Sequence, residues 1–257
     1  EYARKHPFRM DHSGYKNPKP NLEGSRIIEN ISLKEVVSYI NWAAFLAAWK
    51  LPVKYASVDS PDVLKEEGRM KAKEALSLMD DARQLLEQWM KEGKEDLKAI
   101  IGFYPVLREN ECLVIQGKTI PLLRQQEKRE DDQYKSLADF IHPEGDYIGL
   151  FVVTAGENTY SADCGCGSSH KEDDYQEILE HALRDRLVEA ATEYIHERVR
   201  KEYWGYAPDE AFSPGELLKS PYKGSRPASG YPIHPDLSFN FLIDELLDME
   251  RIQVKLT

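Results

Sequence analysis

Two long stretches with apolar residues at helical spacing constrain the fold of this chain more than any other feature. The first spans residues 62–92 and is followed by Gly93; the second spans residues 173–203 and is followed by Gly205 and Pro208. Apolar residues every three or four positions predict a helix that buries one face, and glycine and proline are typical of helix ends. The core must therefore be built around two long amphipathic helices.

Short apolar runs between these helices indicate a sheet. Residues 99–103 and 112–115 flank the polar stretch Arg108 to Glu111, which predicts a hairpin. Residues 147–154 are rich in β-branched and aromatic side chains and form the clearest strand. Because strands and helices do not alternate as βαβ units, the pattern predicts an α+β fold with a mostly antiparallel sheet in a single domain, not a Rossmann fold.

The remaining segments predict shorter elements. Residues 1–25, rich in Pro, Gly, Lys and Asn, are expected to form an extended arm on the body or a link to an upstream segment. Residues 33–49 are apolar and helix-compatible, and their aromatic side chains are expected in the core. A short helix is expected at 241–249, and the alternation of apolar and polar residues over 252–256 predicts a final strand.

Charge and composition exclude several classes of protein. The 257 residues include 45 Asp and Glu but 34 Lys and Arg, a net charge of -11. This field repels phosphate backbones and anionic lipids, so neither nucleic acid nor a membrane is an expected partner. The sequence contains no apolar run of about 20 residues. Three cysteines do not make a disulfide framework, which favours a reducing compartment and a cytoplasmic protein.

Most motifs for enzymatic chemistry are missing from the sequence. There is no glycine-rich phosphate loop, no G-x-S-x-G nucleophile elbow and no H-E-x-x-H zinc helix. Cys164, Cys166 and His170 offer three soft metal ligands, but a fourth is not evident and the spacing is not a usual zinc pattern. We therefore expect a surface loop here and no metal site.

Residues 205–237 contain six prolines and four glycines, which is typical of a shaped binding loop. Within it, Pro227 and Pro232 restrict the backbone on either side of Gly230, which can adopt a positive φ. On this restricted backbone, Arg226 is either a preorganised guanidinium that binds a carboxylate or a surface side chain paired with a local acid. The physical pattern alone leaves both interpretations open.

Several motifs resemble one known family, the activation domain of cobalamin-dependent methionine synthase. The two most specific are R-P-A-S-G-Y-P at 226–232 and H-E-R-V-R-K-E-Y-W-G-Y-A-P at 196–208. Y-I-N-W at 39–42, L-A-D-F at 137–140 and D-Y-I-G-L-F-V-V-T at 146–154 are similar to the family and occur in its order. The resemblance implies that residues 26–257 form a C-shaped domain that binds S-adenosylmethionine without a Rossmann fold.

The resemblance also implies a role in methionine biosynthesis. In the family, cobalamin carries a methyl group from methyltetrahydrofolate to homocysteine and is occasionally oxidised to an inert cobalt(II) form. The activation domain then docks over the cobalamin, S-adenosylmethionine donates a methyl group, and flavodoxin or a related flavoprotein supplies one electron. The chain would thus be part of a methyltransferase, with no catalytic residue of its own.

The family's ligand contacts can be carried over to matching positions. The implied cofactor-binding residues are Arg226, Pro227, Ala228, Gly230, Tyr231, Glu189 and Asn41. Arg226 matches the arginine that binds the ligand carboxylate. Glu189 matches an acidic contact, although Arg186 gives it a plain partner on the helix surface. Asn41 stands where the family often has aspartate, so it lacks the charge-assisted part of a bond to an ammonium group.

Other features bear on context and partners. The family continues past residue 257, so we expect the domain to be truncated there. The chain lacks the D-x-H-x-x-G pattern of the family's cobalamin module, so cobalamin is expected on another domain of the same enzyme.

The basic residues within 196–201 either meet an acidic flavodoxin or form a solvated helix end. The alternative functions are a stand-alone reactivase for another corrinoid methyltransferase and a ligand-free interaction module.

Overall fold

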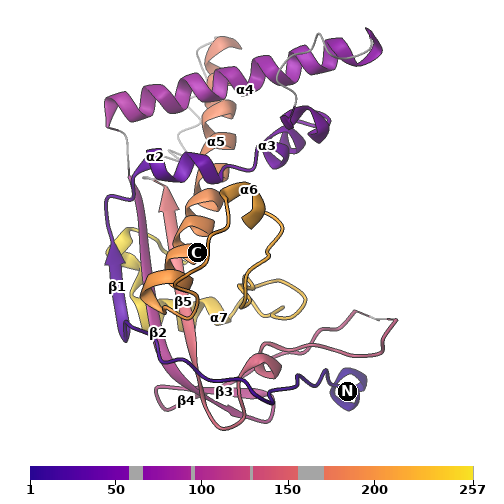
Figure 1. Cartoon of the computed structure of the whole chain (residues 1–257), viewed down its shortest axis with the longest axis vertical. Coiled ribbons are helices and arrows are strands. Elements are labelled where there is room, and N and C mark those ends of the chain that lie inside the picture. The colour runs from indigo at the N-terminus through magenta and orange to yellow at the C-terminus, as the bar shows by residue number, and fades with distance from the viewer. Residues whose placement is uncertain (58–65, 94–95, 128–129, 156–170, 257) are drawn as a thin grey trace.

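The computed structural model describes residues 1–57, 66–93, 96–127, 130–155 and 171–256 (Figure 1). The helices are α1 (Tyr2–Lys5), α2 (Leu33–Val36), α3 (Trp42–Ala48), α4 (Glu66–Glu92), α5 (Lys171–Arg198), α6 (Pro214–Leu217) and α7 (Phe239–Leu247). The strands are β1 (Gly24–Ile28), β2 (Leu97–Glu109), β3 (Cys112–Ile115), β4 (Lys118–Pro121) and β5 (Asp146–Ala155). Short helical turns are η1 (Val37–Tyr39), η2 (Val53–Ser57), η4 (Leu137–Phe140), η5 (Val199–Tyr203, a π turn) and η6 (Met249–Ile252).

Strand β2 is the centre of an entirely antiparallel sheet. It pairs with β5 along almost its whole length, with β1 over residues 99–103, and with β3 over residues 106–109. Strand β4 pairs with β3, which gives the strand order β1-β2-β3-β4. The expected hairpin is confirmed, with Asn110 at a positive φ of 57° in its turn. Consecutive residues of β2 are buried, so both faces of this strand are covered. This burial explains its nearly unbroken apolar sequence.

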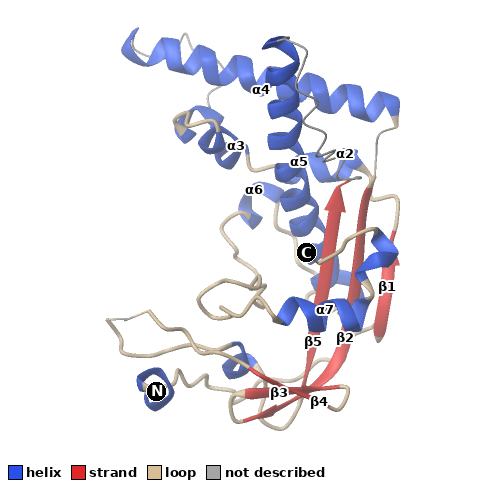
Figure 2. Ribbon diagram, turned by 180° about the vertical axis from the view of Figure 1, so that it is seen from behind, coloured by secondary structure: helices blue, strands red, loops and turns tan. Residues whose placement is uncertain are grey.

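The two faces of the sheet are covered by different helices (Figure 2). Odd-numbered residues of β2, such as Ile101 and Phe103, pack toward α5, whereas even-numbered residues, such as Ile100, pack toward α7. Helix α7 approaches so closely that a Cβ on Gly102 would lie 2.6 Å from Leu247. The α+β class and single domain expected from the sequence are confirmed.

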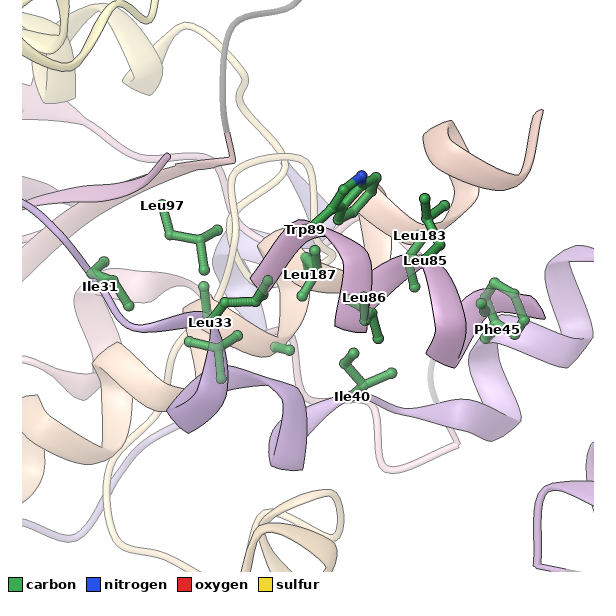
Figure 3. Packing of buried hydrophobic residues seen from close by; sticks show 14 of the residues in the cluster. Ile31, Leu33, Ile40, Phe45, Leu85, Leu86, Trp89, Leu97, Leu183 and Leu187 are labelled. Carbon is green, nitrogen blue, oxygen red and sulfur yellow. The ribbon is translucent and has the colours of Figure 1, made fainter. Parts of the chain in front are cut away.

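The larger core lies among helices α2 to α5 (Figure 3). Figure 3 shows Leu86 and Trp89 of α4, Leu183 and Leu187 of α5, and Phe45 of α3 turned toward one another. Both long helices were expected to build this core, and they do. The buried apolar stripe of α5 begins only at Leu179, because Tyr175 and Ile178, which lie earlier in the predicted helix, are exposed. These contacts hold α5 between the helical layer and the sheet.

The elements are arranged in an open C (Figures 1 and 2). Helices α3 and α4 lie at one end, and strands β3 and β4 lie with the N-terminus at the other; α6 and the loop after it lie between these ends. The N-terminal segment lies on the body: Phe8 N–H donates to Tyr134 O, and the Trp204 indole N–H donates to Pro18 O. Strand β1 begins at Gly24, inside the stretch expected to be an arm.

One sequence expectation for a short element was wrong. Residues 252–256 do not form a strand, because Asp248 and Gln253 both adopt left-handed backbone conformations and fold the chain into the turn η6. The apolar residue Ile252 is nevertheless buried. Residues 33–49 are largely helical, as expected, in three short pieces that are interrupted where Ile40 takes an extended conformation. Because of this interruption, Asn41 lies at the N-terminal cap of α3.

Two further expectations concern membranes and metals. No described helix is both long enough and apolar enough to cross a membrane. Cys164, Cys166 and His170 lie outside the described residues. Within the described part of the chain, no group of three or more His, Cys, Asp or Glu side chains is arranged to hold a metal ion.

Candidate ligand-binding site

The C-terminal half of α5 and the following π turn carry polar residues that are almost fully buried. Glu193, His196 and Arg200 are 8%, 5% and 0% exposed. They follow one another at spacings of three and four residues, so they share one side of the helix. Helix α5 therefore buries a polar face as well as an apolar stripe. π turns inside helices often occur at functional sites.

Arg200 is the fixed centre of this polar face. Its Nε donates to both carboxylate oxygens of Glu210, at 3.0 and 2.9 Å, and its Nη2 donates to Glu210 Oε1 at 2.6 Å. The guanidinium lies over the ring of Tyr222, 3.8 Å from its centroid. A bidentate ion pair with a ring beneath it holds the arginine in one orientation.

His196 is neutral because of its surroundings. Its Nδ1 lies 2.8 Å from Arg200 Nη1, and since arginine can only donate, Nδ1 is the acceptor and the ring proton is on Nε2. Burial, together with the positive charges of Arg226 and Arg200, lowers the pKa of His196 to about 3. The expectation of a basic surface over 196–201 was therefore wrong in part: His196 and Arg200 face the interior.

Arg226 meets an acid of α5 directly. Its Nη2 donates to Glu193 Oε2 at 2.7 Å. The Arg226 side chain is 27% exposed and that of Glu193 is 11% exposed, so the arginine is accessible to solvent while the acid lies beneath it. Burial raises the pKa of Glu193, and the positive charges of Arg226 and Arg200 oppose this effect.

The second oxygen of Glu193 has no hydrogen-bond partner among the described residues. Glu193 Oε1 is buried, and Arg200 Nη1 lies 3.9 Å away, close enough for an ion pair but too far for a hydrogen bond. A buried carboxylate oxygen without a donor costs free energy. The site thus contains an acceptor that a positively charged donor would satisfy.

The loop that carries Arg226 is pinned by a buried histidine. Gly230 N–H donates to His234 O, and His234 N–H donates to Tyr231 O, both at 2.8 Å. His234 is 3% exposed and packs edge to face on Phe239. Gly230 adopts φ +92°, as the sequence indicated. The result is a fixed turn in which Tyr231 is 62% exposed.

Asn41 lies at the junction of η1 and α3. Its Oδ1 accepts a hydrogen bond from Ala44 N–H at 3.0 Å and caps helix α3. The junction is tied to α5 by two tyrosine hydroxyls: Tyr39 donates to Glu197, and Tyr194 donates to Glu35 at 2.9 Å. The structure therefore uses the Asn41 oxygen for capping and anchors its segment to the same helix as Glu193.

Glu189 lies on the outside of α5. Its side chain is 59% exposed and accepts a hydrogen bond from Arg186 at 2.8 Å, the helix-surface partner that the sequence offered. The acid that contacts Arg226 is Glu193, one turn further along. Sequence reasoning missed Glu193, although an acid four residues after Glu189 was a usable signal, because residues at this spacing lie on the same side of a helix.

The other expected residues lie on the Arg226 loop. Pro227 is partly buried, and Ala228 and Gly230 are exposed. The structure thus groups Arg226, its loop and Glu193. Glu189, on the outside of the same helix, and Asn41, at the start of α3, have partners of their own.

Comparisons with known proteins point to one family. A family model described as vitamin B12 dependent methionine synthase, activation domain, matches residues 32–257. The chain is also similar to a solved structure, the MetH reactivation domain bound to AdoHcy. That similarity has 33% sequence identity and a TM-score of 0.81, and covers 99% of this chain and 79% of the other.

Proposed function

Because this chain belongs to the family of vitamin B12-dependent methionine synthase activation domains, we propose that it binds S-adenosylmethionine as the methyl donor for reactivation of that enzyme. S-Adenosylmethionine is AdoHcy with one more methyl group on sulfur, and AdoHcy is the ligand of the solved relative. This family membership matches the resemblance found in the sequence. The proposal therefore concerns which residues of this chain hold the ligand.

The observation that carries the proposal is the position of Arg226. A guanidinium has five N–H donors, of which one is used by Glu193. With 27% of its side chain exposed, Arg226 has an open edge for a second carboxylate. Bidentate binding of a carboxylate is the interaction for which arginine geometry is best suited. We assign Arg226 to the carboxylate at the amino-acid end of the ligand.

The fixed loop after Arg226 supplies the surface for the rest of the ligand. The backbone at Ala228 and Gly230 is exposed, and the Tyr231 ring stands free of the body. An aromatic ring attracts a cation such as a sulfonium and can stack with a nucleobase. Because His234 holds the loop from beneath, little conformational entropy is lost when the ligand binds.

The proposed reaction needs two further components. Cobalamin, bound by another domain of the same enzyme, would supply the metal chemistry, and flavodoxin or a related flavoprotein would supply one electron. The residues of this chain bind and orient the methyl donor. We place this activity in methionine biosynthesis in the cytoplasm, and we regard the isolated domain as a binding module without a catalytic residue.

Calorimetry with the full chain tests the proposal. We expect S-adenosylmethionine and AdoHcy to bind, and Arg226→Ala to weaken both by about 10- to 150-fold, the effect of losing one charged hydrogen-bonded contact. Arg4→Ala is the matched control, because Arg4 is an exposed cation of the N-terminal helix α1 that is paired with Glu111. Equal affinities of wild type and Arg226→Ala would contradict the assignment.

One observation favours a second candidate function, a ligand-free interaction module: Arg226 already has an acidic partner in Glu193. This alternative predicts no heat of binding from the wild-type chain with either ligand. The same titration therefore separates the two functions.

A further inference from the structure

The chain reaches the Arg226 loop through a segment that has little contact with the body. Of residues 218–225, seven are exposed and Tyr222 alone is partly buried. The last buried residue before this segment is Leu217, at the end of α6. An exposed segment has few contacts that restrict its conformation. The position of Arg226 therefore depends on the few residues that attach the segment to the body.

Tyr222 packs on a fixed charge. Its ring centroid lies 3.8 Å from the guanidinium carbon of Arg200, and its ring also meets that of His196 edge to face, with the centroids 5.0 Å apart. Arg200 is 0% exposed, and its Nε donates to both carboxylate oxygens of Glu210. The attraction between a cation and an aromatic ring is strongest where water is excluded. The body thus offers Tyr222 a rigid and desolvated partner.

A second contact holds the same part of the segment. The Tyr206 hydroxyl donates to Lys223 O at 3.2 Å. Gly224 adopts φ +97° and lies so close to this hydroxyl that a Cβ would be 2.6 Å from it. Tyr222 and Lys223 come four and three residues before Arg226. The segment is therefore attached immediately before the loop that it leads into.

We propose that Tyr222 is a positioning residue: by packing on Arg200 it holds Arg226 where its guanidinium meets the ligand carboxylate. The inference rests on the proposed binding of S-adenosylmethionine through Arg226, and it gives Tyr222 no ligand contact of its own. Without the ring, the segment leaves helix α5 in part of the molecules. Only molecules with Arg226 in place bind the ligand, so the apparent affinity falls in proportion to their fraction.

Three variants test the role of the ring, with the affinity for AdoHcy measured by calorimetry. Tyr222→Leu should bind AdoHcy about 5- to 30-fold more weakly than wild type, the effect of losing a desolvated cation–π contact. Tyr222→Phe keeps the ring face and should stay within about 2-fold of wild type. The matched control Tyr175→Leu removes a tyrosine that is 42% exposed near the start of α5, and it should keep the wild-type affinity.

A double variant shows whether Tyr222 acts through Arg226. If it does, Tyr222→Leu should weaken binding no further once Arg226→Ala is present, because there is no guanidinium left to position. A loss by the same factor in both backgrounds would show that Tyr222 affects binding by another route, and the inference would be wrong. A residue that only stabilises the domain would not produce this dependence on Arg226.

The outcomes separate this inference from the proposed function. If the wild-type chain does not bind AdoHcy, or if Arg226→Ala binds it equally well, the proposed function fails and the inference fails with it. If Arg226→Ala weakens binding but Tyr222→Leu does not, or if Tyr222→Phe weakens it as much as Tyr222→Leu, the inference alone is wrong. Should Tyr222→Leu not fold, Tyr222→Met, which fills space without a ring, replaces it under the same criteria.

Discussion

The neutral, buried His196 predicts how the stability of the domain depends on pH. In the folded chain its Nδ1 accepts from Arg200, and its pKa is lowered from 6.5 to about 3. In the unfolded chain the imidazole has its ordinary pKa. Between these two values the unfolded state binds one proton more than the folded state, so the free energy of unfolding falls as the pH falls from 7 toward 3.

The size of the effect follows from the two pKa values. At pH 5 the unfolded-state imidazole is mostly protonated, whereas the folded-state imidazole is still neutral. Going from pH 7 to pH 5 should therefore remove about 2 kcal/mol from the free energy of unfolding through this residue alone. That is a large share of the stability of an ordinary domain.

Urea unfolding followed by tryptophan fluorescence measures this loss, with His196→Gln as the comparison. Glutamine keeps an acceptor oxygen for Arg200 but has no group that titrates in this range. Burial also lowers the pKa of His234, but that histidine is present in both proteins and cancels. We expect wild type to lose about 2 kcal/mol more than the variant between pH 7 and pH 5. An identical pH dependence in both proteins would refute the buried, neutral state of His196.

Two other predictions test the packing of helix α5 and the capping of helix α3, which position the site. Leu183→Ala should destabilise the domain by about 2–5 kcal/mol in chemical unfolding, because Leu183 is 0% exposed. The control Ile178→Ala on the same helix, where the side chain is 56% exposed, should change stability by less than about 0.5 kcal/mol, and similar losses from both would contradict the packing of α5. Asn41→Ala should cost about 0.5–2 kcal/mol through loss of the cap on Ala44 N–H, whereas Asn41→Asp should retain the cap; equal losses would show that capping is not its role.

The elements that could be predicted from the sequence are those with long periodic patterns. Helices α4 and α5 bury many residues at regular spacing, and strand β5 is a continuous run of mostly apolar residues, so the sequence predicted all three. Strand β4 was missed, because four residues with little burial leave no periodic signal. The prediction of a final strand was wrong because Asp248 and Gln253 adopt left-handed conformations that turn the chain, and the alternation of apolar residues does not reveal them.

Only part of the site could be predicted from the sequence, because several of its contacts join residues that are far apart along the chain. The loop around Arg226 is marked by its prolines and glycine, which act locally. The partner of Arg226 depends on which residue of α5 faces the loop, and Glu193 lies 33 residues away in the sequence. The burial of Arg200 and His196 likewise depends on Glu210 and Tyr222, which pack on them from the chain that follows the helix. Such contacts are set by tertiary packing and have no local signature.

A crystal structure of the chain with AdoHcy tests the central claim most directly. We predict that the ligand carboxylate lies within hydrogen-bond distance of the Arg226 guanidinium, beside the carboxylate of Glu193. A bound AdoHcy whose carboxylate lies elsewhere, with Arg226 still bonded to Glu193 alone, would contradict the account.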